Sequence, residues 1–137
     1  MWKYYALLSA LFAGMTAVLA KTGVKGINGN IATAVRTGIV LLMAWGIVIF
    51  QGQLKDVAGL NKTNVLFLVL SGVATGLSWI FYFKALETGN VSKVAPIDKL
   101  SIVFVLIFSV LFLHEQADWK TVAGTALICG GTFVLLL

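Results

Sequence analysis

Charged side chains beside long apolar runs are the residues of this sequence that could do chemistry. Arg36 stands about five residues inside one apolar run, and Lys84 and Glu87 stand three residues apart near the end of another. Asp98 and Lys99 follow shortly after the single proline. Such charges are costly inside a membrane unless they meet a partner, a headgroup or a water-filled path. They therefore indicate either local pairing or a route for a polar solute.

Two interpretations of these charges stay open. In the first, Lys84 and Lys99 reach the membrane surface, and Glu87 and Asp98 are charge-pair candidates for them. Arg36 fits this interpretation less well, because helix geometry places it roughly 8 Å deep. In the second, these groups and nearby lysines form a basic vestibule at one end of the helices. Such a vestibule suits an anionic or zwitterionic ligand, or a lipid phosphate.

Aromatic side chains extend the second interpretation into the apolar runs. Trp45 and Trp79 lie deep in their runs, and Tyr82 follows Trp79 by three residues. Packing between helices is the ordinary role of such rings, and lining a ligand path is the alternative. The full set of substrate-path candidates is Arg36, Trp45, Trp79, Tyr82, Lys84 and Lys99.

The sequence contains no recognisable set of catalytic residues. The chain has one cysteine, Cys129, and one histidine, His114. We find no Ser/His/Asp set, no cluster with metal-ligand spacing and no phosphate-binding glycine motif. We therefore expect neither enzymatic activity nor a metal or other cofactor. The net charge of +5 is spread over segment ends, which indicates membrane topology and contact with lipid rather than nucleic acid.

Composition indicates the fold class. Of the 137 residues, 60% are hydrophobic and 11% are charged, and the mean hydropathy is +1.00. A soluble domain is nearer half apolar and a quarter charged, so we predict an all-α membrane protein with a single domain, residues 1–137. Its expected transmembrane helices are about 4–20, 31–50, 65–86, 96–113 and 119–137.

Two local predictions follow from this division. Pro96 is expected in the first turn of the fourth helix, where its missing N–H costs nothing, which puts Asp98 and Lys99 near the membrane surface. The first run resembles a signal peptide, but we expect it to remain as a helix. Lysines and arginines are nearly balanced between the loops of the two sides. This balance is typical of insertion in both orientations, and also of a small sample, so the topology stays open.

Small residues mark the faces on which helices could pack in lipid. These faces could join helices within one chain or join two subunits. The helix-packing candidates are Gly14, Gly72, Gly76, Gly124 and Gly131.

The order of these features resembles one repeat of the EamA family of the drug/metabolite transporter superfamily. No single feature is specific, and the resemblance rests on their order and spacing along the five runs. The features are Gly14 with Lys21, Arg36, Tyr82–Leu86, Gly89, Ser92, Ala95–Ile97, Glu115, Gly124, Leu127–Ile128 and Gly131.

The resemblance implies a secondary transporter that exports small metabolites or drugs across the plasma (inner) membrane as a multi-pass protein. Many relatives carry two inverted repeats, so a single repeat implies an antiparallel homodimer or a heterodimer with a similar small subunit. In the related small multidrug resistance proteins, an acidic residue in the first helix exchanges protons for cationic drugs. Residues 4–20 have no acidic residue, so the resemblance does not extend to that mechanism. The alternatives are a subunit of a lipid-linked-substrate flippase and a non-transporting assembly or regulatory protein. Substrate, coupling ion and direction stay undetermined.

Overall fold

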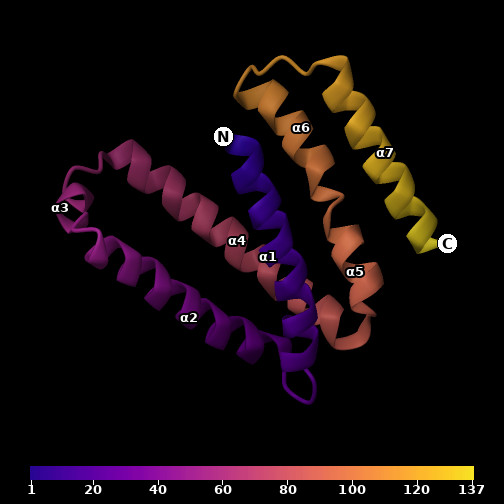
Figure 1. Ribbon diagram of the computed structural model, residues 1–137, viewed down its shortest axis with the longest axis horizontal. Coiled ribbons are helices and arrows are strands. Elements are labelled where there is room, and N and C mark those ends of the chain that lie inside the picture. Colours follow the sequence, from indigo (N-terminus) through magenta and orange to yellow (C-terminus); the bar gives the residue numbers. More distant parts are fainter. The chain divides into compact units, whose positions relative to one another are not determined.

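The chain folds into helices alone (Figure 1). The computed structural model describes all 137 residues, which form seven helices and no strand. Five stretches are long and apolar enough to cross a membrane, the fourth of them running through α5 and α6. The prediction of an all-α membrane protein with five transmembrane segments is therefore confirmed. The helices are α1 Trp2–Gly23, α2 Gly29–Phe50, α3 Leu54–Val57, α4 Lys62–Thr88, α5 Val91–Asp98, α6 Ser101–Phe112 and α7 Trp119–Leu136.

The helices that form the first three spans begin before the predicted apolar runs. Polar caps explain part of this difference. The side chain of Asn28 accepts a hydrogen bond from the backbone N–H of Asn30 at 2.8 Å, which starts α2 at Gly29. Hydropathy marks where a segment enters lipid, whereas hydrogen bonding decides where the helix starts and stops.

The fourth span corrects the prediction that Pro96 opens a helix. Pro96 lies inside α5, which begins at Val91, and Asp98 is the last residue of that short helix. Proline removes one intrahelical hydrogen bond and crowds the preceding turn. A tight turn follows Pro96, in which the Lys99 N–H donates to the Pro96 carbonyl at 3.0 Å. Asp98 and Lys99 therefore lie roughly 10 Å into the span, instead of in its first turn.

Residues 19–88 form one compact unit. In it α2 and α4 pack against each other as an antiparallel pair connected through α3 (Figure 1). Their buried residues gather where α2 begins and α4 ends: Gly29 and Thr33 on α2, and Phe83 and Leu86 on α4. The opposite end of α4, residues 62–75, is exposed throughout. The pair is thus fixed at one end.

Residues 1–18 and 89–137 form the other unit. Here α5 and α6 pack on α7, whose Thr125 and Thr132 are buried. Asp118 starts α7 by accepting hydrogen bonds from the hydroxyl and the backbone N–H of Thr121. These two hydrogen bonds hold the pKa of Asp118 below its usual range.

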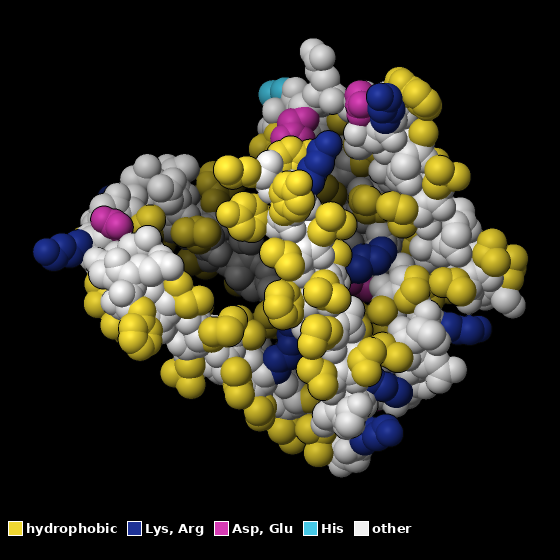
Figure 2. Space-filling view, in the orientation of Figure 1, with side chains coloured by type: hydrophobic (Ala, Val, Ile, Leu, Met, Phe, Trp, Pro, Cys, Tyr) yellow, Lys and Arg dark blue, Asp and Glu magenta, His cyan; other side chains and the backbone are white.

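Apolar side chains cover the visible helix surfaces (Figure 2). Leu42 is 75% exposed and Phe81 is 68% exposed, although both lie in membrane spans. In lipid such surfaces cost nothing, since acyl chains are as apolar as leucine. Exposed apolar side chains in the spans therefore do not indicate a functional site, whereas polar and charged side chains inside the spans can.

Candidate functional site

The start of α2 and the end of α4 are held together by a close backbone approach at Gly29. A Cβ placed on Gly29 would lie 2.5 Å from Glu87 Oε1 and 3.2 Å from the backbone carbon of Phe83. The backbone N–H of Gly29 donates to Glu87 Oε1. This N–H belongs to the first turn of α2, where it lacks a partner within the helix and where the helix dipole favours a carboxylate.

Lys21 makes the matching contact at the end of α4. Its ammonium group donates a hydrogen bond to the carbonyl of Leu86, one of the last carbonyls of that helix. A cation at this position satisfies a carbonyl that has no partner within the helix and complements the dipole. Glu87 therefore fixes the start of α2 on the end of α4, and Lys21 joins the end of α1 to the end of α4.

Arg36 lies on the same face of α2 as Gly29, seven residues and about two turns further along. Trp79 lies four residues before Phe83 on the facing side of α4. The guanidinium carbon of Arg36 is 4.2 Å from the centroid of the Trp79 ring and 5.7 Å from that of Phe83. We call Arg36, Trp79 and Phe83 the arginine–aromatic cluster.

The cluster stabilises a cation inside a membrane span without a carboxylate. Ring faces attract a guanidinium through their quadrupoles, by about 2 kcal/mol where water is excluded. Arg36 is half-buried and makes no hydrogen bond or ion pair within the chain. Its N–H groups therefore remain available to an acceptor from outside the chain.

The other substrate-path candidates of this unit divide between two places. Tyr82 is half-buried and lies edge-on to Phe83, with ring centroids 6.3 Å apart. Trp45 follows Arg36 by nine residues, which is about half a turn away from the cluster face. Lys84 is exposed. The structure thus brings Trp79 to Arg36 and Tyr82 to the neighbouring Phe83, but leaves Trp45 and Lys84 apart from the cluster.

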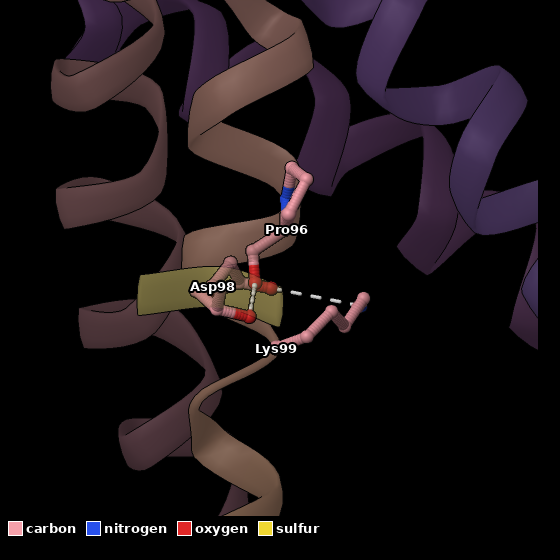
Figure 3. Close-up of polar contacts among 4 residues, drawn as sticks. Pro96, Asp98 and Lys99 are labelled. Carbon is pink, nitrogen blue, oxygen red and sulfur yellow. Dashed lines mark hydrogen bonds and ion pairs between the residues drawn. The ribbon is translucent and has the colours of Figure 1, made fainter. Parts of the chain in front are cut away.

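The two charge-pair candidates have different partners. The spacing of Lys84 and Glu87 suggested a pair, but the Glu87 carboxylate instead accepts from Gly29 N–H. Asp98 pairs with Lys99 at 3.6 Å, at the interruption after Pro96 (Figure 3). Across the same interruption, the hydroxyl oxygen of Thr132 on α7 lies 3.5 Å from the Pro96 carbonyl, while its shorter hydrogen bond, at 2.9 Å, is donated to the Ile128 carbonyl of its own helix. Asp98 and Lys99 therefore form a separate ion pair in the other unit.

Within the single chain, the helix-packing candidates are not points of close approach, and a role in packing between subunits stays a prediction. A Cβ on any of them would meet nothing within 4 Å; they are Gly14, Gly72, Gly76, Gly124 and Gly131. Gly29 is the tight position, and sequence reasoning missed it because it stands in a Gly/Asn-rich turn. Phe83 was missed as well, although its position four residues after Trp79 signals a shared helix face.

Comparisons with known proteins agree with this architecture. Residues 1–137 match the EamA-like transporter family. An "Uncharacterized transporter in cobO 3'region" from a Sinorhizobium species is 48% identical over 134 residues, covering 98% of this chain and 95% of that protein. The human solute carrier family 35 member G1 is 26% identical over 122 residues, covering 88% of this chain but 33% of that protein. No solved structure gives a significant match. With five membrane-spanning segments and a family match along its whole length, this chain belongs to the EamA-like transporter family.

Proposed function

We propose that this chain is a secondary transporter that exports small metabolites or drugs across the plasma (inner) membrane by alternating access. The observation that carries the proposal is Arg36, a charged side chain kept inside a membrane span on the rings of Trp79 and Phe83. Ionisable groups inside spans characteristically mark solute and ion pathways. Membership of a transporter family supports the same function.

We propose that the working form is an antiparallel dimer, either of two copies or with a similar small subunit. An odd number of spans means that a duplicated unit is inverted relative to the first. The near balance of Lys and Arg between the two sides is compatible with insertion both ways. The human relative, of which the chain covers 33%, is also long enough to hold more than one such unit.

The path would run along the arginine–aromatic cluster, with Tyr82 beside it. Lys84 and Trp45 would take part only if a partner or a second conformation brings them there, because they lie apart from the cluster. Asp98 and Lys99, at the interrupted fourth span of the other unit, would form a polar site of their own. Broken helices near binding sites are a recurrent device of secondary transporters.

Reconstitution tests the proposal directly. Purified chain in liposomes should move members of a metabolite panel when a solute or proton gradient is imposed, and empty liposomes should not. Reporters fused to either terminus should reveal both orientations, or a fixed orientation together with a co-purifying small subunit. A single fixed orientation with no partner would contradict the antiparallel dimer.

The alternatives predict other results. A flippase subunit would co-purify with lipid and would lose function when a co-expressed partner is removed. An assembly or regulatory protein would bind a partner but move no solute under any gradient.

A further inference from the structure

We propose that the arginine–aromatic cluster binds the oxyanion of an organic anion, a carboxylate or a phosphate attached to an apolar or aromatic body. This inference rests on the proposed transport function and names its substrate class. Three features of the cluster carry it: the geometry of the guanidinium, the lack of a neighbouring acid, and the apolar surroundings.

The aromatic rings position the Arg36 guanidinium but leave its N–H donors without an acceptor. Trp79 and Phe83 hold its carbon at 4.2 and 5.7 Å from their ring centroids. Aromatic faces partly neutralise the charge, but they do not replace five N–H hydrogen bonds. A planar fork of donors matches carboxylate and phosphate oxygens in pairs. An oxyanion is therefore the ligand that best completes Arg36.

The unit that holds Arg36 supplies no acid for this purpose. Residues 19–88 contain two acidic side chains, Asp56 and Glu87. Glu87 already accepts the Gly29 N–H, roughly 10 Å along α2 from Arg36. Asp56 lies in α3, beyond the far end of α2. A protein that transported cations would place a carboxylate at this point, whereas this unit places an unpaired cation there.

The surroundings indicate the body of the ligand. Trp79 and Tyr82 are half-buried and so leave ring surface for a ligand, whereas Phe83, at 2% exposure, is already covered by the chain. A ligand oxyanion on Arg36 would put its next atoms beside the rings of Trp79 and Tyr82. An aromatic or aliphatic body gains from that contact, whereas a strongly hydrated inorganic anion does not.

Trp79 provides a readout that does not depend on transport. We would replace Trp2, Trp45 and Trp119 with Phe, so that Trp79 is the only emitter, and place the chain in nanodiscs of phosphatidylcholine. Benzoate and phenyl phosphate should change the Trp79 emission saturably, and benzylammonium and benzamide should not. R36Q should weaken the affinity about tenfold or more, because a charge-assisted, bidentate contact is lost.

Two further variants protect the test against misfolding. R36K keeps the charge but loses the fork, and it should bind benzoate more weakly than the wild type while remaining folded. K55Q removes one positive charge from α3, far along the chain from the cluster, and should bind benzoate as the wild type does. Equal responses to benzoate and benzylammonium would overturn the proposal, and so would an R36Q or R36K affinity within twofold of the wild type.

A second arm separates a free anion from a lipid headgroup. The titration is repeated in nanodiscs that contain phosphatidylglycerol. A response to this lipid but to neither soluble anion would support the oxyanion class and assign the phosphate to a lipid. Anion binding without solute movement in liposomes would refute transport and leave the site standing. Transport of cations unaffected by R36Q would refute the site and leave transport standing.

Discussion

Replacing Gly29 with alanine tests the packing that positions Arg36. The added Cβ would lie 2.5 Å from Glu87 Oε1 and 3.2 Å from the backbone carbon of Phe83. The carboxylate must then swing away and lose the Gly29 N–H, and α2 must move a few tenths of an ångström from α4. Overpacking of this kind costs about 2 kcal/mol, which lowers an unfolding midpoint by about 7 °C in a chain of this size.

Gly38 provides the matched control on the same helix. A Cβ there meets nothing within 4 Å, so Gly38→Ala should gain helix propensity of about 0.5 kcal/mol or more. Thermal unfolding in one detergent, followed by circular dichroism, gives both midpoints. The two glycine-to-alanine changes should move the midpoint in opposite directions.

A double-mutant cycle identifies the source of the cost. In a Glu87→Ala background the closest clash is gone, so Gly29→Ala should cost about 1 kcal/mol less than in the wild type. The reasoning is refuted if Gly29→Ala unfolds at the wild-type temperature, or if its cost is the same in both backgrounds.

Two more predictions concern polar contacts in the other unit. Asp118 has a lowered pKa, so its cap on Thr121 contributes fully above the unfolded-state value of about 3.9 and fades as pH falls through the lower folded value. Asp118→Ala should lower the melting temperature at pH 7, and Asp118→Asn should remove this acid-dependent component, as pH-resolved melting curves would reveal. Lys99→Met should destabilise the chain more than the double change Asp98→Asn with Lys99→Met, because the single change leaves a carboxylate unpaired inside a span. Equal melting temperatures of the single and double variants would count against that pairing.

The fold class was predictable from the sequence because hydropathy and length are averages over some twenty residues, and errors in single positions cancel. The interruption of the fourth span was not. Proline is acceptable both in the first turn of a helix and at a kink, and hydropathy does not distinguish the two. Val91–Ala95 read as loop because they follow polar residues, although they form the first turns of α5.

Only part of the candidate site was predictable from the sequence. Arg36 and Trp79 stood out singly because charged and aromatic residues are unusual inside an apolar run. Their association depends on how α2 lies on α4, which is decided by the close approach at Gly29. Spacing along α4 suggested an ion pair between Lys84 and Glu87. Instead, the Glu87 carboxylate accepts a hydrogen bond from the backbone of α2. Spacing along a helix shows which side chains share a face, whereas the partners that they take on another helix require the structure.

Solute flux is the most direct test of the central claim that this chain is a transporter. The measurement uses liposomes in which the purified chain is the sole protein, loaded with an unlabelled organic anion and exposed to a trace of the labelled compound. We predict saturable counterflow that R36Q reduces and K55Q leaves unchanged. Absence of counterflow for every anion, cation and neutral solute tested, with the chain still folded in the vesicles, would contradict the account.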